Sequence, residues 1–422
     1  MRPRTRVTVL TTSAVVLALS ATPLAAPAFA SPAANTVCDT KPTTVTKTAP
    51  ATTAAHPAAD HRPTADHRTA GPDAKALRAA LGGLPDTDAT AALVRVGGRD
   101  GSWRGSAGVH DLTSGRAADP DARFRAGSTT KVVTAATVLR LAADGRIDLD
   151  APVQHYLPGL LTAAFQPISV RQLLNHTSGI QAGDGWGDDF EDQYAHRFDT
   201  VTPQQLVASA VAKGPEFCPG RGQDYLNINY TVLGMLIEKV TGHSYAEEAT
   251  RLVLRPAGMR HTYFPGTDPR IHGPHNHGYQ KVTRPDGTAR FVDVTEWNQA
   301  ANWAAGDMIS TTADLERLIT ALFGGRIVPQ PQLQEMFTVP AGIKDATYSA
   351  GLRQLTYKGT VYWTKSGARY GYSTGIVATQ NLSRTLVYSV NSTDAKGDGM
   401  NPVAQRIVLA AVKQQPEQQA AR

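Results

Sequence analysis

The chain has 422 residues, 41% of them hydrophobic, which is enough for one large domain or two smaller ones with a sizeable core. Its formal charge of +6 includes three arginines in the first thirty residues, which hold no lysine and no acid, so the remainder carries +3. So weak a positive charge, with no long basic run, excludes nucleic-acid binding driven by electrostatics.

Residues 1–30 are typical of a signal peptide. Three arginines precede an apolar stretch from Val7 to Leu19, and Ala28 and Ala30 place small side chains before a cleavage site. The short apolar stretch and the two prolines after it disfavour an anchor of about 20 apolar residues. We therefore expect a secreted, extracellular protein of the cell-wall space, with no stable membrane insertion after the leader is cleaved.

Residues 31–72 are rich in Thr, Ala and Pro and hold few large apolar side chains, so we expect a disordered spacer. Cys38 lies in this segment, and Cys218 is the only other cysteine. An exported protein meets oxidising conditions, which favours a disulfide between them over two unpaired thiols. Such a bond would fasten the spacer near the residues that carry the chemistry.

The folded region begins near Asp73 with apolar residues at helical spacing. Two strand-like stretches, Ala91–Val96 and Ser102–Val109, flank a glycine-rich hairpin signal. The block from about 128 to 325 is mostly helical, and Ala313–Phe323 is one of its helices. The order of elements up to this point is therefore helix, hairpin and helical block.

Consecutive strands are predicted after about residue 347, followed by a closing helix. They cover Tyr348–Leu355, Thr360–Thr364, Gly375–Thr379 and Arg384–Val390, and the helix covers Val403–Val412. Strands from both ends of the folded region can join one antiparallel sheet with the terminal helices on a face. This predicts an α+β fold, an α/β sandwich plus an all-helical lobe, with the site in the cleft between the lobes.

The predicted hydrolase domain spans residues 73–415, followed by a tail at 416–422. Its sheet lobe takes about 73–125 and 330–415, and its helical lobe takes about 126–329.

Ser128 and Lys131 stand at the start of a predicted helix that continues to about Leu141. Residues three apart share a helix face, so the hydroxyl and the amine can meet. A serine becomes a nucleophile when a base takes its proton, and burial or a nearby cation can lower a lysine pKa from about 10.4 to 7–8 for that purpose. Alone, the spacing more often marks a capping serine followed by a surface lysine.

Two further motifs follow in the chain. In an extended segment, Tyr225-Leu226-Asn227 directs both polar side chains to one side. Lys365-Ser366-Gly367 ends a late strand, where the glycine permits close backbone approach, and the N–H of Ala368 can join that of Ser128 in an oxyanion hole. Each motif is weak alone, because buried tyrosines and surface lysines are common.

Together, the three motifs resemble in order and context those of penicillin-interacting serine enzymes. The resemblance to class C β-lactamases and soluble D-alanyl-D-alanine carboxypeptidases covers about residues 75–413. It is carried further by the segments Phe124–Lys131, Leu173–Gly179, Pro219-Gly220, Tyr225–Gly242, Asn276–Tyr279 and Trp303–Gly306. It implies a β-lactamase/transpeptidase-like fold and a serine hydrolase that needs no cofactor. We expect a monomer acting on a cell-wall peptide or a β-lactam.

The resemblance also implies a role for each motif residue. Ser128 would be acylated, and Lys131 and Tyr225 would share general acid and base duty, with the base left open between them. Substrate binding would fall to Asn227, which holds the amide, and to the Lys365–Ala368 stretch: Lys365, Ser366, Gly367 and Ala368.

The third motif departs from the family pattern in two ways. Ser366 stands where threonine is usual, and Lys365 stands where the carboxypeptidases of nearest appearance have histidine. A D-alanyl-D-alanine peptide is the first choice of substrate, with a β-lactam and an ester as alternatives. A non-catalytic penicillin- or wall-binding protein is disfavoured, because Ser128, Lys131 and Tyr225 are all present.

A histidine-rich stretch offers a competing zinc site. His272, His275 and His277, with His261 nearby, have spacing that can hold zinc. No glutamate lies on a helix between paired histidines, and glycine and proline are frequent there. We therefore expect a loop with incidental histidines and no metal.

Overall fold

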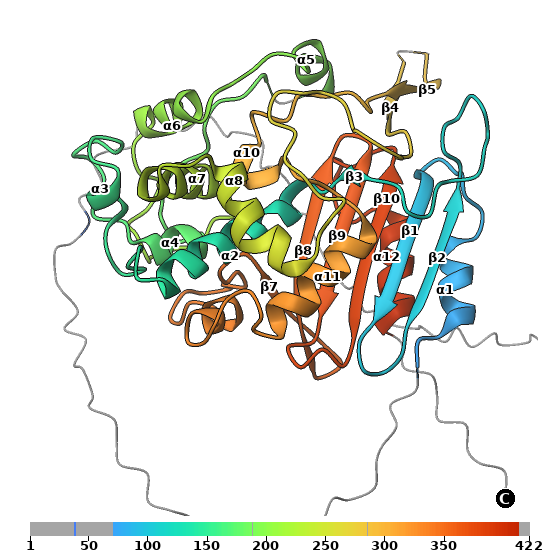
Figure 1. Cartoon of the computed structure of the whole chain (residues 1–422). Coiled ribbons are helices and arrows are strands. Elements are labelled where there is room, and N and C mark those ends of the chain that lie inside the picture. The colour runs from blue at the N-terminus through green and yellow to red at the C-terminus, as the bar shows by residue number, and fades with distance from the viewer. Residues whose placement is uncertain (1–37, 39–70, 188, 285, 413–422) are drawn as a thin grey trace, which may run out of the picture.

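A six-stranded antiparallel sheet forms one half of the molecule and a group of helices forms the other half (Figure 1). This computed structural model describes Cys38 and residues 71–187, 189–284 and 286–412. The sheet order is β2-β1-β10-β9-β8-β7, so the first hairpin lies beside the last strand. The strands are β1 (Ala89–Gly97), β2 (Trp103–Gly108), β7 (Arg353–Tyr357), β8 (Thr360–Arg369), β9 (Tyr372–Ala378) and β10 (Thr385–Ser392). The predicted α+β fold, with strands from both ends of the folded region in one sheet, is confirmed.

Two terminal helices, α1 (Ala74–Leu81) and α12 (Pro402–Val412), cover one face of the sheet. Their buried side chains, among them Leu77 and Ile407, form one apolar cluster with residues of β1, β9 and β10. The Asp73 carboxylate caps α1 by accepting hydrogen bonds from two N–H groups of the first turn. This face of the sheet is held by apolar packing.

The opposite face of the sheet meets α11 (Thr312–Phe323) and the helical lobe, at whose centre lies α2 (Thr130–Ala143). From Thr130 to Leu139 every residue of α2 is buried, since α7, α8 and α10 pack around it. The other helices are α3 (Val153–Tyr156), α4 (Val170–Leu174), α5 (Phe190–Ala195), α6 (Pro203–Ala212), α7 (Asn227–Thr241), α8 (Tyr245–Ala249), α9 (Arg255–Ala257) and α10 (Trp303–Gly306). Shorter elements are β3 (Phe124–Arg125), β6 (Ile309–Ser310) and the turns η1 (Gly127–Thr129), η2 (Thr250–Leu254) and η3 (Gln332–Phe337). One end of α2 therefore lies between sheet and helices.

Local structure differs from the sequence expectations at three places. A two-stranded hairpin, β4 (Tyr279–Thr283) with β5 (Ala289–Asp293), interrupts a block that is otherwise mostly helical, as expected. Strand β8 does not end at the Lys-Ser-Gly motif, because pairing with β9 carries it on to Arg369. The Tyr-Leu-Asn segment is only partly extended, because α7 already begins at Asn227.

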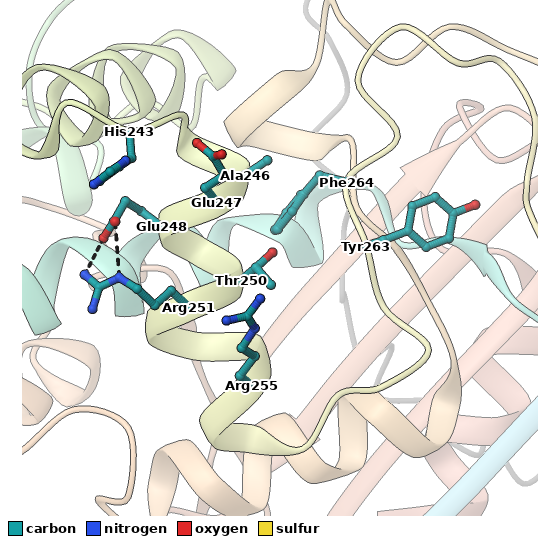
Figure 2. Close-up of a pocket in the computed structure, with 9 residues that line it drawn as sticks. All are labelled: His243, Ala246, Glu247, Glu248, Thr250, Arg251, Arg255, Tyr263 and Phe264. Carbon is teal, nitrogen blue, oxygen red and sulfur yellow. Dashed lines mark hydrogen bonds and ion pairs between the residues drawn. The ribbon is translucent and has the colours of Figure 1, made fainter.

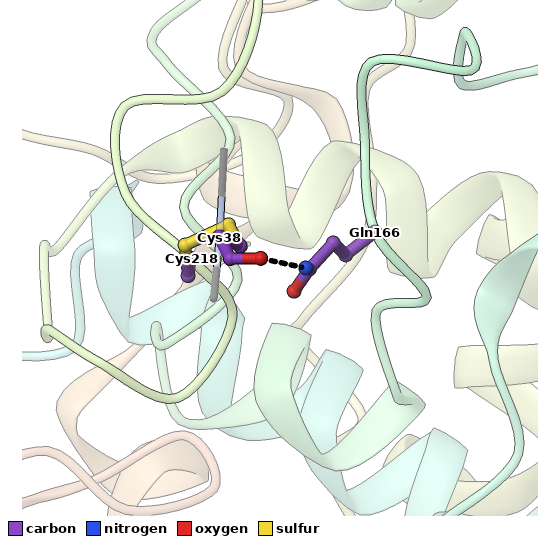
Figure 3. The surroundings of a disulfide bond; sticks show 3 residues. All are labelled: Cys38, Gln166 and Cys218. Carbon is purple, nitrogen blue, oxygen red and sulfur yellow. Dashed lines mark hydrogen bonds between the residues drawn. A yellow bond between two sulfur atoms is a disulfide. The ribbon is translucent and has the colours of Figure 1, made fainter. Parts of the chain in front are cut away.

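A disulfide joins Cys38 to Cys218, with their Cα atoms 5.9 Å apart (Figure 3). The Cys38 carbonyl also accepts a hydrogen bond of 3.5 Å from the Gln166 side chain. Residue 38 is thereby attached to the helical lobe at Cys218, which lies seven residues before Tyr225. The predicted leader at 1–30, the spacer apart from Cys38 and residues 71–72, and the tail at 416–422 lie outside the described residues. Within the described ranges, no helix has both the length and the apolar character needed to cross a membrane.

Candidate active site

Ser128 lies in the η1 turn, directly against strand β8. Gly127 has a φ of +52°, and a Cβ there would come within 2.8 Å of the Ala368 nitrogen. A Cβ on Gly367 would lie 3.0 Å from the Ser128 nitrogen and would collide with the Ala126 carbonyl. Only glycine at both positions permits this approach. It places the backbone segments that carry the N–H groups of Ser128 and Ala368 against each other, and an oxyanion hole formed by these two groups needs such an approach.

The Lys131 amine lies one helical turn further on and has three oxygen neighbours. Its Nζ is 3.2 Å from Ser128 Oγ, 2.6 Å from Asn227 Oδ1 and 2.8 Å from the Ala305 carbonyl. The amide and the carbonyl oxygens can only accept hydrogen bonds. A neutral amine gives its two protons to them, and its lone pair is then left for the Ser128 hydroxyl proton.

The surroundings of Lys131 favour that neutral form. The side chain is fully buried, and burial, followed by Lys365 and more distant cations, lowers its pKa well below the usual value. Two aromatic rings, of Tyr225 and Tyr230, lie 5.1 and 5.6 Å from Nζ. The ring faces can attract a cation, but burial and the like charges of neighbouring basic side chains outweigh this and oppose protonation.

Tyr225 occupies the other side of Ser128. Its hydroxyl is buried and has no hydrogen-bond partner among the described residues. Burial raises its pKa, and the neighbouring Ser128 hydroxyl acts weakly in the opposite direction. Tyr225 therefore keeps its proton at neutral pH, whereas Lys131 is poised to lose one.

Two rings and a cation pack against Tyr225. The centroids of His176 and Tyr348 lie 4.6 and 4.8 Å from its own, and Lys365 Nζ lies 4.5 Å above its ring. His176 has a φ of +63°, is buried, and has a pKa lowered well below its usual value by burial and by the charges of Lys131 and Lys365. A neutral histidine therefore packs against the Tyr225 ring.

Lys365 lies on β8 with its amine beside the Tyr225 ring. Its Nζ donates to the Ser366 carbonyl at 2.9 Å, and burial, with Arg353 as the second cause, lowers its pKa to about 7. Ser366 is exposed on the same strand. Lys365 is therefore partly protonated at neutral pH and can attract an anionic group that reaches it.

The structure brings the predicted residues together around Ser128, from three separate parts of the chain. Sequence reasoning missed Ala305, whose carbonyl holds Lys131, and the packing of His176 and Tyr348 on Tyr225. Both the His176 and the Ala305 segments belong to stretches that resemble the family, but that resemblance assigned them no role. Ala305 follows Trp303, whose φ of +32° is strained for a large side chain.

The histidines considered for zinc have other partners. His272 is 2.7 Å from Asp268, His277 is 2.7 Å from Asp293, and His275 Nδ1 is 2.8 Å from the Gly273 carbonyl. The His261 ring lies 3.3 Å from the Arg123 guanidinium. In the described part of the chain, no group of three or more His, Cys, Asp or Glu is arranged to hold a metal.

A separate cavity of about 450 Å³ lies along α8 and η2 (Figure 2). The Arg251 guanidinium pairs there with the buried Glu248 carboxylate at 2.6 Å. The cavity is lined by His243, Ala246, Glu247, Glu248, Thr250, Arg251, Arg255, Tyr263 and Phe264. None of the motif residues lines it, so the motif residues gathered around Ser128 define the candidate site instead.

A half-buried serine with a fully buried lysine at a helix start, between an antiparallel sheet and a helical lobe, defines a serine hydrolase of the penicillin-interacting type. The chain belongs to the Beta-lactamase family, whose model matches residues 54–410.

Solved structures and curated relatives agree with this assignment. A D-stereospecific amidohydrolase from Streptomyces sp. is 34% identical, with a TM-score of 0.70 over 81% of this chain and 99% of that one. A D-amino acid amidase from Ochrobactrum anthropi SV3 is 25% identical, with a TM-score of 0.65 over 80% and 98%. Penicillin-binding protein 4* of Bacillus subtilis is 27% identical over 70% of this chain and 67% of its own length.

Other curated relatives match over shorter stretches. Esterase EstB of Burkholderia gladioli is 33% identical over 43% of this chain. The chain spans about half the length of some relatives, namely 49% of EstB and 54% of the Bacillus subtilis protein PbpX.

Proposed function

We propose that this protein is a secreted D-alanyl-D-alanine carboxypeptidase acting on peptidoglycan peptides. The cations around Ser128 carry this proposal. Lys365 lies beside the proposed catalytic groups, and the charged groups that act on the Lys131 pKa are cations. Among the described residues, no carboxylate forms an ion pair with Lys131 or Lys365. Such a site attracts a peptide with a free terminal carboxylate and repels a free ammonium.

The first half of the reaction follows from the hydrogen bonds of Lys131. The neutral amine takes the Ser128 proton while Oγ bonds to the substrate carbonyl carbon. The oxyanion forms between the N–H groups of Ser128 and Ala368. Because Asn227 Oδ1 is taken by Lys131, its exposed amide nitrogen is the group that faces the substrate amide.

The second half releases the terminal D-amino acid. The protonated Lys131 returns its proton to the leaving nitrogen through the Tyr225 hydroxyl, which is protonated because its pKa is raised and passes its proton on as it receives one from Lys131. The amide C–N bond breaks, and the terminal carboxylate leaves the Lys365 ammonium. Water then hydrolyses the Ser128 ester, with Lys131 again taking a proton.

A second candidate is hydrolysis of D-amino acid amides. Its support is the likeness to the D-stereospecific amidohydrolase and the D-amino acid amidase, both of which cover about four fifths of this chain. An amino acid amide has a free ammonium and no carboxylate, so the cations around Ser128 should bind it less well than a peptide. A β-lactamase and a carboxylesterase remain alternatives within the same chemistry.

Labelling with a fluorescent penicillin tests the nucleophile, and substrate assays separate the activities. We expect the wild-type protein to be labelled and Ser128→Ala to show no label. Release of D-alanine from N-acylated D-Ala-D-Ala should exceed hydrolysis of D-alaninamide, of a chromogenic cephalosporin and of a short ester. An unlabelled wild type, or a labelled Ser128→Ala, would contradict the mechanism. Faster hydrolysis of the amide than of the peptide would favour the second candidate.

A further inference from the structure

Strand β8 has an unpaired edge beside Ser128. β9 pairs with β8 from Trp363 to Arg369, whereas β7 pairs with it only from Thr360 to Thr364. Within the described chain, residues 365–369 therefore have no strand partner on the side of β7. An extended peptide can add to such an edge through its backbone, and this fixes where its side groups point.

Two cations lie at the two ends of this edge, on one face of the sheet. Alternate residues of a strand share a face, so Lys365, Gly367 and Arg369 point to the same side. Lys365 is 5% exposed and Arg369 is 7% exposed. Four residues of strand place them about 13 Å apart. Since Gly367 lies against the Ser128 turn, a carbonyl positioned for attack has one cation on each side.

The Arg369 guanidinium is buried without a carboxylate partner. Its Nη1 donates to Asn302 Oδ1 at 2.7 Å, while its buried Nε has no partner among the described residues. Burial and the nearby Arg125 lower its pKa to about 10, so it remains charged at neutral pH. A buried cation beside a like charge is costly, and a bound anion offsets that cost.

Arg369 is also linked to the catalytic groups. Asn302, its hydrogen-bond partner, directly precedes α10, whose Ala305 carbonyl holds the Lys131 amine. Arg369 is moreover among the cations that lower the Lys131 pKa. An anion bound to this guanidinium therefore lies beside the reaction centre and not on a remote surface.

We propose that Arg369 binds a carboxylate on the acyl part of the substrate, so that the preferred peptide is anionic on both sides of the bond that is cut. This inference rests on the proposed function, in which Lys365 takes the carboxylate of the leaving amino acid. Because Arg369 lies at the other end of the same edge, its ligand belongs to the part that stays on Ser128. Acidic stem peptides fit this pattern, and peptides with a neutral acyl part do not.

A matched pair of substrates tests the proposal in the full chain. N-glutaryl-D-alanyl-D-alanine has a carboxylate on its acyl group, and its carboxamide analogue has the same shape without the charge. We expect a kcat/KM about 10-fold or more higher for the carboxylate, as for a charge-assisted hydrogen bond. Arg369→Gln should bring this ratio close to one, and Arg369→Lys should retain part of it. Arg104→Gln, at an exposed cation on β2, should keep the wild-type ratio.

Two results overturn the proposal: a wild-type ratio of one, or equal losses on both substrates in Arg369→Gln, which would make Arg369 structural. The same acyl groups are also offered as D-alanyl thioesters with a neutral leaving group. Hydrolysis of the thioesters without hydrolysis of the peptides would mean that the carboxypeptidase proposal fails. The thioester ratio would still decide the role of Arg369.

Discussion

The two faces of the sheet are stabilised in different ways. The face under α1 and α12 is packed with apolar side chains such as Leu386 and Ile407. The face toward α2 buries Lys365 and Arg369, and Lys131 of α2 is buried on the same side, each with a pKa lowered by burial. Burial of ionisable groups costs free energy that apolar packing elsewhere must offset. The comparison indicates that one face supplies stability and the other uses it to hold reactive groups.

Among the changes at the face that holds the reactive groups, Lys131→Met should have the largest effect on activity. It removes the proposed base, so kcat/KM for acylation falls about 10²- to 10⁴-fold. In the wild type the unfolded state binds more protons between the lowered pKa of Lys131 and the ordinary value near 10.4. The free energy of unfolding should therefore rise with pH relative to the variant. Denaturant titrations at pH 6, 8 and 10 measure this, and a difference independent of pH would contradict a neutral Lys131.

Gly367→Ala should have the next largest effect on activity. The added Cβ collides with the Ala126 carbonyl and comes within 3.0 Å of the Ser128 nitrogen. Displacing one oxyanion donor costs about 10²- to 10³-fold in kcat. Gly185→Ala is the control, because a Cβ there meets no atom within 4 Å. Wild-type turnover by Gly367→Ala would mean that this backbone approach has no catalytic part.

Ile407→Ala tests the other face. Ile407 is fully buried under the sheet, and truncation of such a side chain costs about 2–5 kcal/mol of unfolding free energy. The kcat/KM of the folded variant should not change, since α12 is on the face away from Ser128. Leu409→Ala, on the exposed side of the same helix, should cost under about 0.5 kcal/mol. A loss of activity in folded Ile407→Ala would show that the faces are coupled.

The smallest effect concerns pH and Lys365. Its pKa of about 7 means that the ammonium is lost as the pH rises above that value. We expect the ratio of kcat/KM for a carboxylate-bearing peptide to that for a neutral ester to fall about 10-fold between pH 6 and 9. Using the ratio cancels the titration of Lys131, which affects both substrates. A ratio that does not change between pH 6 and 9 would show that Lys365 does not bind the carboxylate.

The elements that the sequence predicted well have local signals. Ser128 in the η1 turn and Lys131 in the first turn of α2 are only three residues apart, and Gly242, with a φ of +76°, ends α7 where the apolar period stops. The missed hairpin, β4 with β5, has a mostly exposed second strand in which the large apolar residues Phe291 and Val292 are adjacent, so no apolar alternation marks it. Strand β8 continues past its glycine because β9 pairs with it there, which no short window of sequence can report.

The site was predictable in its residues and less so in its contacts. Lys131 meets Asn227 and Ala305 across sequence separations of 96 and 174 residues. The Ala305 carbonyl has no side-chain signature, and its direction depends on the strained backbone at Trp303. The base was left open between Lys131 and Tyr225, because only burial in the folded state moves their pKa values in opposite directions.

The Cys38–Cys218 bond makes the chain covalently circular over 181 residues, since its sequence separation is 180. Cutting any one peptide bond between residues 39 and 70, for example after Arg62, leaves two polypeptides that the disulfide still joins. They would migrate as one species on a gel without reductant and separate when reductant is added. The fragment that ends at Arg62 would stay fastened beside Gln166 as long as the solvent is oxidising.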